Sequence, residues 1–127
     1  MPLVRIDLVR GKPASYRKAL GEIVYTAMRE TIDVPLDDKF QVITEHAPDE
    51  FNIAPAYLGN HYSHDIVLIQ ITMSVGRTVE KKKALFRRIA DDLQAQLGLR
   101  QDDVFINLVE TVKENWSFGS GVAQYAT

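Results

Sequence analysis

The chain has 127 residues, a formal net charge of −2 at pH 7, 46% hydrophobic residues and no cysteine. This length fits one domain, residues 1–127, with enough chain to bury a core, and the net charge argues against nucleic-acid binding driven by phosphate neutralisation. The lack of cysteine excludes disulfides, thiolate nucleophiles and cysteine-ligated zinc.

Two further classes of protein are disfavoured. No apolar run approaches the roughly 20 residues that a transmembrane helix needs, and the N-terminus lacks the apolar core of a signal peptide. We therefore expect a cytoplasmic protein without a membrane partner. The three histidines, His46, His61 and His64, form no recognisable metal-binding pattern, so no metal and no cofactor is assigned.

The first half of the chain predicts a strand, a helix and a second strand. Apolar and polar residues alternate over residues 3–8, as in a strand, and Gly11 ends the pattern. Pro13 suits the first turn of a helix. Apolar residues then recur at three- and four-residue steps over residues 16–28, as on one face of a helix. Residues 40–45 read as the second strand.

The second half repeats this order after a long loop, residues 46–64, punctuated by two prolines and a glycine. Loops of this length are uncommon in compact domains and are often functional. Residues 66–73 predict a strand, Thr78 can cap a helix that Gly98 ends, and residues 104–109 predict a fourth strand. The tail from Asn115 onward is rich in aromatic residues and glycine.

The two halves are related by a constant offset of 65 residues. Identical residues recur at this offset across strand, turn and helix: Leu3 and Leu68, Ile6 and Ile71, Gly11 and Gly76, Lys18 and Lys83, Leu20 and Leu85, Asp38 and Asp103, Phe40 and Phe105, Glu45 and Glu110. The chain is therefore read as two βαβ repeats, residues 1–65 and 66–127.

This repeat predicts an α+β fold. Right-handed crossovers make the two strands of each unit parallel, which gives a four-stranded mixed sheet with both helices on one face. The other face is also fairly apolar, and no element is left to cover it. We expect that face to be buried against other subunits.

Pro2 differs from its counterpart in the other repeat, Val67, which is an ordinary strand residue. Methionine is usually removed when the second residue is small, which would leave Pro2 as a free secondary amine. An unperturbed α-amino group titrates at roughly 7.7–8.0. A proline nitrogen is more basic, and burial beside cations lowers its pKa. Pro2 is therefore a candidate proton carrier near neutral pH.

Six motifs resemble those of the tautomerase superfamily, and the closer match is to its malonate semialdehyde decarboxylase-like branch. They are MPL (1–3), VPLDD (34–38), FQVI (40–43), GRT (76–78), VFINLVE (104–110) and NWSFG (115–119). The resemblance covers essentially the whole chain. It implies a tautomerase-like (MIF-like) fold and a homotrimer with active sites near the subunit interfaces.

The resemblance also implies roles for five residues. Pro2 would be the catalytic amine, Asp38 would position or activate water, and Arg77 would hold a substrate carboxylate, while Trp116 and Phe118 would form the apolar wall of the pocket. One departure concerns chemistry. The best-known decarboxylases carry two arginines after the third strand, where this chain has Ser74 and Gly76.

Some of these residues could instead have purely structural roles. Asp37 and Asp38 have a common turn composition, and their repeat partners, Asp102 and Asp103, favour a structural role for at least one of them. Trp116 and Phe118 would belong to a core or an interface in most proteins. Arg77 lies where a helix dipole disfavours a cation, which points to function.

The sequence, together with this resemblance, favours a cofactor-free keto–enol tautomerase that acts on a small, phenylpyruvate-like 2-oxo acid. Pro2 would act as general base or acid, since positioned proton transfer accelerates such reactions. The enzymatic alternative is decarboxylation or hydration of the malonate semialdehyde type. Two non-enzymatic alternatives remain: a trimeric scaffold that keeps the fold, and a ferredoxin-like ligand-binding module.

Overall fold

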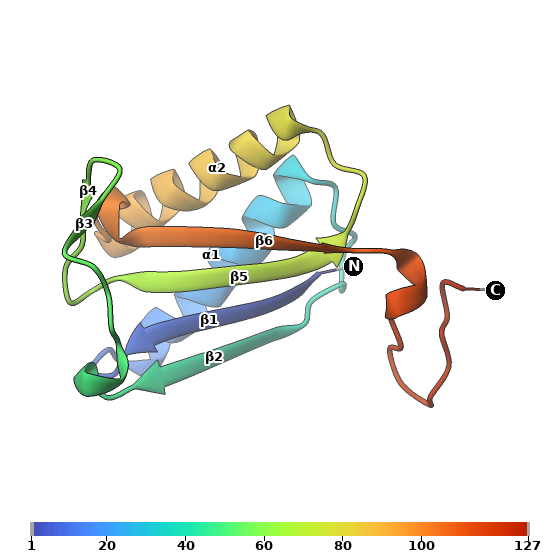
Figure 1. The fold of residues 1–127 in the computed structure, drawn as a ribbon, viewed down its shortest axis with the longest axis horizontal. Helices are drawn as coiled ribbons and strands as arrows, with labels where there is room; N and C mark the ends of the chain where they lie inside the picture. Colours follow the sequence, from blue (N-terminus) through green and yellow to red (C-terminus); the bar gives the residue numbers. More distant parts are fainter. Residues whose placement is uncertain (1, 127) are drawn as a thin grey trace.

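The computed structural model describes residues 2–126, and it shows a four-stranded sheet with two helices packed on one face (Figure 1). The long elements are β1 (Leu3–Val9), α1 (Ala14–Thr31), β2 (Gln41–His46), β5 (Val67–Ser74), α2 (Val79–Leu97) and β6 (Val104–Thr111). All six were predicted from the sequence. None of the helices in the described part combines the length and the apolarity needed to cross a membrane.

The strand order is β2-β1-β5-β6. β1 is parallel to β2, and β5 is parallel to β6, so each helix is a crossover between parallel neighbours. β1 and β5 are antiparallel at the centre, with Leu3 opposite Thr72 and Leu8 opposite Val67. This arrangement confirms the predicted mixed sheet built from two βαβ units.

The core lies between the sheet and the helices. Alternate side chains of the central strands point towards the helices, including Val4, Ile6, Ile69 and Ile71. These pack against buried residues on the two helices, namely Leu20, Ile23, Val24, Ala27, Met28, Leu85, Ile89 and Leu93. The apolar faces predicted by the period-two strand pattern and the period-3.6 helix pattern therefore pack against each other in one core layer.

The opposite face of the sheet is open, and it is less apolar than the sequence indicates. Its apolar members are Leu3, Val42, Leu68, Phe105 and Val109. Strand alternation, read with the pairing registers, also places Arg5, Asp7, Gln70 and Asn107 there. Two polar pairs lie on it: the Gln70 amide donates to Asn107 at 3.0 Å, and His46 contacts Asp7 at 2.6 Å.

The repeat extends to backbone conformation. Gly11 and Gly76, which are equivalent, have φ angles of 126° and 129°. The helix ends also match, since Asp33 and Gly98 are left-handed with φ angles of 60° and 67°. Residues other than glycine rarely adopt these backbone conformations. The two units therefore share their turn geometry as well as their elements.

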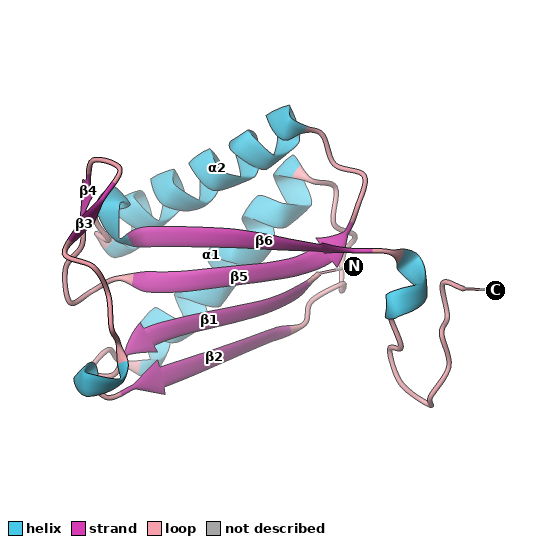
Figure 2. Cartoon of the chain, in the orientation of Figure 1, coloured by secondary structure: helices cyan, strands magenta, loops and turns pink. Residues whose placement is uncertain are grey.

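The predicted loop at residues 46–64 contains structure that the sequence analysis missed. It holds η1 (Pro48–Glu50) and a short hairpin of β3 (Ala56–Tyr57) and β4 (Asn60–His61), both visible in Figure 2. Two further 3-10 turns flank β6, η2 (Gln101–Asp103) and η3 (Lys113–Asn115).

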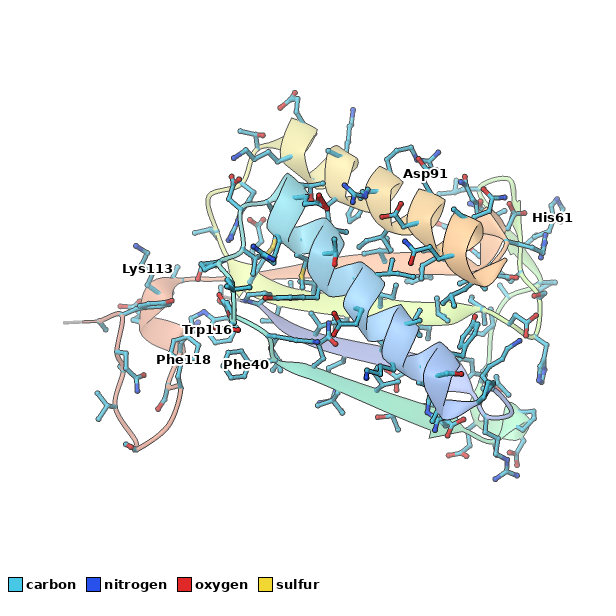
Figure 3. All side chains as sticks on the ribbon, turned by 180° about the vertical axis from the view of Figure 1, so that it is seen from behind. Phe40, His61, Asp91, Lys113, Trp116 and Phe118 are labelled. Atoms are coloured by element: carbon cyan, nitrogen blue, oxygen red, sulfur yellow. The ribbon has the colours of Figure 1, made fainter. Side chains whose placement is uncertain are left out.

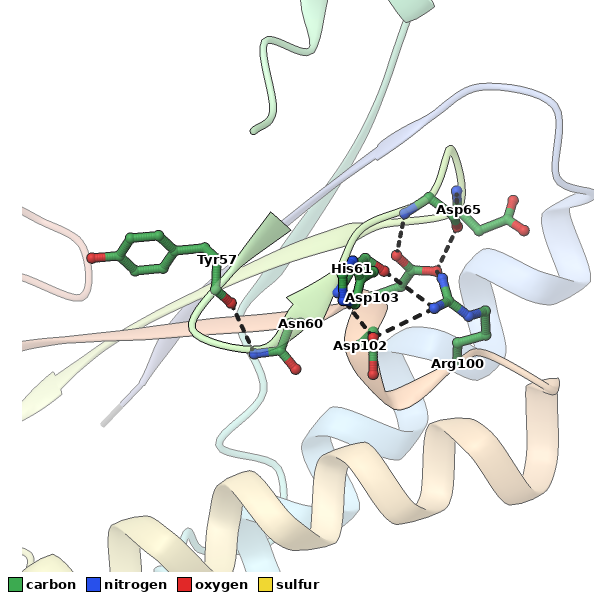
Figure 4. Close-up of polar contacts among 8 residues, drawn as sticks. Tyr57, Asn60, His61, Asp65, Arg100, Asp102 and Asp103 are labelled. Atoms are coloured by element: carbon green, nitrogen blue, oxygen red, sulfur yellow. Dashed lines mark hydrogen bonds and ion pairs between the residues drawn. The ribbon is translucent and has the colours of Figure 1, made fainter. Parts of the chain in front are cut away.

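The hairpin is fastened to η2 by carboxylates. The Asp102 carboxylate accepts the His61 N–H at 2.9 Å, and Asp103 accepts the Ser63 N–H at 2.7 Å. Arg100 donates to both the His61 carbonyl and Asp103 (Figure 4). These bonds link segments about 40 residues apart, which explains why local patterns did not reveal the hairpin.

Candidate active site

Pro2 is buried at the start of β1, where three other strands begin or end. The Val4 N–H donates to the Phe40 carbonyl at 2.9 Å, so the start of β2 lies alongside. Leu3 is paired with Thr72, which brings the end of β5 to the other side. Met1 lies outside the described residues, so its removal stays a prediction.

An aromatic cluster lies at this end of the sheet (Figure 3). The Trp116 and Phe118 rings are stacked, with centroids 5.5 Å apart. Phe40 lies 6.5 Å from Phe118, and Tyr125 meets Phe118 edge-on at 5.2 Å. The sequence predicted Trp116 and Phe118 as the wall of a pocket but missed Phe40 and Tyr125. The aromatic composition of the tail was the available signal for Tyr125.

Asp38 has an unusual environment for a carboxylate. Its side chain is buried, with 6% exposed, and neither carboxylate oxygen has a hydrogen-bond partner. Burial raises the pKa of Asp38 above its ordinary value of 3.8, and the positive charges of the N-terminus and Arg77 oppose that rise. Buried carboxylates are normally paired, so Asp38 is an exception that requires explanation.

The equivalent residue in the other repeat, Asp103, is fully satisfied. It is completely buried, and it accepts bonds from the Ser63 backbone and hydroxyl and from Arg100. The neighbouring Asp37 has a local role, because its N–H donates to the Tyr25 hydroxyl at 2.9 Å in a turn with positive φ. The two aspartates before β2 are thus separated: Asp37 builds the turn, and Asp38 is left without a partner.

Arg77 is held against the backbone at the end of β5. Its guanidinium donates to the Ser74 carbonyl at 3.2 Å and to the Ile32 carbonyl at 3.4 Å. Its repeat partner, Lys12, instead pairs with Asp65 at 3.1 Å. A guanidinium has five N–H donors, so Arg77 retains donors beyond these two bonds and a full positive charge.

Two more polar groups at this end lack partners. The Ser74 hydroxyl is buried without a hydrogen bond, and so is the Trp116 indole N–H. Within residues 2–126, every buried side-chain polar atom without a partner belongs to Asp38, Ser74 or Trp116. In the sequence, Ser74 is notable only as the position of a missing arginine. Its unsatisfied hydroxyl is a property of the folded chain.

Other candidate residues have structural roles or lie elsewhere. Glu45 pairs with Arg17 at 3.1 Å, and its equivalent Glu110 pairs with Lys82 at 2.9 Å. A cleft of about 540 Å³ between α2 and β6 is lined mainly by apolar and basic side chains, including Phe86. It lies near the start of β6, at the end of the sheet opposite Pro2, and its lining offers no carboxylate.

Comparisons with known proteins show which proteins this chain resembles. Two family models, each described as a tautomerase enzyme, match residues 38–119 and residues 2–61. The probable tautomerase YusQ of Bacillus subtilis (strain 168) is 41% identical, and the match covers 98% of each chain.

Two solved structures are also similar over nearly the whole chain. A malonate semialdehyde decarboxylase inhibited by 3-bromopropiolate is 37% identical with a TM-score of 0.89, covering 97% of this chain and 93% of that one. A second malonate semialdehyde decarboxylase, described as having decarboxylase and hydratase activities, is 30% identical with a TM-score of 0.90. That match covers 97% of this chain and 95% of that one.

Proposed function

Because this chain belongs to the tautomerase enzyme family, we propose that it is a cofactor-free keto–enol tautomerase of small 2-oxo acids. Pro2 is its proton carrier, and the amine becomes available when Met1 is removed. As a neutral amine, Pro2 takes a proton from the carbon beside the substrate carbonyl and returns it at the enolate oxygen. The reverse transfer converts the enol to the ketone.

Other side chains at this end of the sheet tune the Pro2 amine and bind the substrate. Trp116 and Phe118 present apolar surface, which disfavours the ammonium form of the Pro2 amine. Arg77 attracts the substrate carboxylate and stabilises the negative charge that develops on the enolate. A base titrating near the working pH is the most effective kind for such a transfer.

The observation that carries this proposal is the buried, unpartnered carboxylate of Asp38 at the end of the sheet where Pro2 lies. The same position in the other repeat shows that this fold can satisfy such a carboxylate fully. A group that is left unsatisfied in one repeat only is typical of a functional site. Asp38 orients the substrate or a water beside the Pro2 amine.

The assembly in this proposal is a homotrimer whose open sheet faces point inward. The open face carries exposed apolar side chains such as Phe105 and Val42, and a chain of this size gains stability by covering them. Subunit contacts there would also close the site, whose residues lie at one end of the same sheet.

Decarboxylation or hydration of a malonate semialdehyde-like acid is the second candidate, because a similar protein has both activities and Asp38 can activate water. Two features favour tautomerisation. Ser74 replaces one of the two arginines of the best-known decarboxylases. The other position is Gly76, whose φ of 129° would be strained for any residue that carries a β-carbon.

Parallel assays separate these activities. We expect the purified enzyme to ketonise enol-phenylpyruvate, followed by ultraviolet absorbance, faster than it releases CO₂ from malonate semialdehyde. Pro2→Ala should lower the first rate by roughly 10²-fold, the usual size of a positioned proton-transfer effect. Faster decarboxylation would instead favour the second candidate. Inactivity towards both compounds would favour a trimeric scaffold.

A further inference from the structure

Ser74 carries a buried hydroxyl that makes no hydrogen bond within the described chain. It ends β5 with 8% of the residue exposed, and its hydroxyl has no hydrogen-bond partner. The equivalent residue of the other repeat is Val9, which is also buried, at the end of β1. The same backbone position therefore accepts an apolar side chain, so packing alone does not account for the serine.

A neighbouring hydroxyl gives a direct comparison. Thr111 on β6 lies opposite Ser74 in the strand register. Its hydroxyl donates to the Met73 carbonyl at 3.4 Å. Two hydroxyls thus lie at the same end of adjacent strands, and one of them is satisfied within the chain. The other, on Ser74, has no partner within the described chain, and a buried polar group without a hydrogen bond is unfavourable until it acquires one.

The charge beside Ser74 identifies the kind of ligand. Arg77 donates to the carbonyl of Ser74 itself, so its guanidinium is held against the same residue. An anionic group that binds Arg77 would therefore lie near Ser74, whose hydroxyl has no partner within the described chain. A carboxylate has two oxygens, and it can accept one bond from the guanidinium and one from the hydroxyl.

We infer that the Ser74 hydroxyl binds the substrate carboxylate together with Arg77 and so sets a preference for 2-oxo acids over neutral carbonyl compounds. This inference rests on the proposed function. Ser74 makes a binding contact and carries no proton of the reaction. Its effect should therefore appear in KM more than in kcat, and it should disappear when the substrate has no carboxylate.

The test compares Ser74→Ala with Thr111→Val as the matched control. For each protein, kcat and KM are measured with enol-phenylpyruvate and with the enol of its methyl ester. Ser74→Ala should lower kcat/KM for the acid by about 10-fold, as expected for one hydrogen bond to a charged group, and leave the ester unchanged. Thr111→Val should leave the acid-to-ester ratio as it is in the unmodified enzyme.

An equal loss on both substrates, or no loss on either, would overturn the inference. Equilibrium binding of 3-phenylpropionate, which has a carboxylate but no carbonyl to enolise, separates this inference from the proposed function. If the unmodified protein is inactive but binds this probe about 10-fold more tightly than Ser74→Ala does, the proposed function fails and the Ser74 contact stands. Absent or unchanged binding would refute the contact.

Discussion

Asp38 and Asp103 occupy equivalent positions in the two repeats, and both side chains are buried. Asp103 accepts three hydrogen bonds from Ser63 and Arg100, whereas Asp38 accepts none. The residue type and its place in the repeat are therefore the same, and only the surroundings differ. At the residue scale, this contrast separates the structural carboxylate of Asp103 from that of Asp38, which we propose to be functional.

Replacing Asp38 by asparagine should reduce turnover by roughly 10²-fold and stabilise the fold near neutral pH. Burial raises the pKa of Asp38 above 3.8 in the folded chain, so the folded state binds this proton more tightly than the unfolded state does. The wild type therefore loses stability relative to Asp38→Asn as the pH rises from below 3.8 through the folded-state pKa. Urea unfolding of both proteins across that range measures the difference, which should be absent at the acid end.

Asp103→Asn is the matched control and should do the opposite. It weakens bonds to a fully buried carboxylate, and we expect a loss of about 2 kcal/mol in the free energy of unfolding at neutral pH. Turnover per folded molecule should be retained. Similar stability changes for the two variants would contradict the distinction drawn between the two aspartates.

The site was only partly predictable from single residues. Pro2, Arg77, Trp116 and Phe118 carry recognisable types or motifs, and the structure places them at one end of the sheet. Ser74 could not be found in the same way, because its sequence position looks like an ordinary strand end. Whether a hydroxyl is satisfied depends on atoms far away in the chain.

At the scale of elements, the repeat determined most of what could be predicted. Hydrophobic periodicity gave both helices and all four long strands, and the offset of 65 residues related their turns. The β3–β4 hairpin was not predicted, because its strands have only two residues each. It is held by long-range hydrogen bonds that the His61 and Ser63 N–H groups donate to the Asp102 and Asp103 carboxylates, which no local pattern encodes.

The end of α2 provides a prediction at this scale. Gly98 is left-handed, with a φ of 67°, and its N–H bonds to the Gln94 carbonyl. Gly98→Ala should lower the free energy of unfolding by about 1 kcal/mol, because a β-carbon is disfavoured in this conformation. Chemical denaturation measures the loss.

Gly98→Asn is the control for this prediction. Asparagine tolerates the left-handed region better than alanine does, and the equivalent end of α1 already has an aspartate, Asp33, in that conformation. The asparagine variant should therefore be more stable than the alanine variant. The reverse order would show that the backbone at Gly98 is not what limits the substitution.

At the scale of the whole molecule, the open face of the sheet is the main feature left uncovered. The helices protect one face, and Phe105 is 45% exposed on the other. Polar pairs such as Gln70 with Asn107 share that face, so the surface suits a specific interface with both apolar and polar contacts.

Phe105→Asp should dissociate the proposed trimer. A charge in an apolar contact is strongly disfavoured, so sedimentation should change from three times the 14.4 kDa chain mass towards a single chain. Val79→Asp alters another exposed apolar residue, at the start of α2 on the helical side, and should leave the oligomer intact. Equal sedimentation of both variants would contradict an interface at the open face.

The state of the Pro2 amine decides whether Pro2 is the proton carrier of the enzyme. The intact mass of the purified protein is measured before and after treatment with 3-bromopropiolate, an inhibitor of a similar decarboxylase, while enol-phenylpyruvate turnover is followed. We expect a protein without Met1, a single adduct that maps to Pro2, and loss of turnover in step with labelling. A retained methionine, or full turnover in the labelled protein, would contradict this expectation.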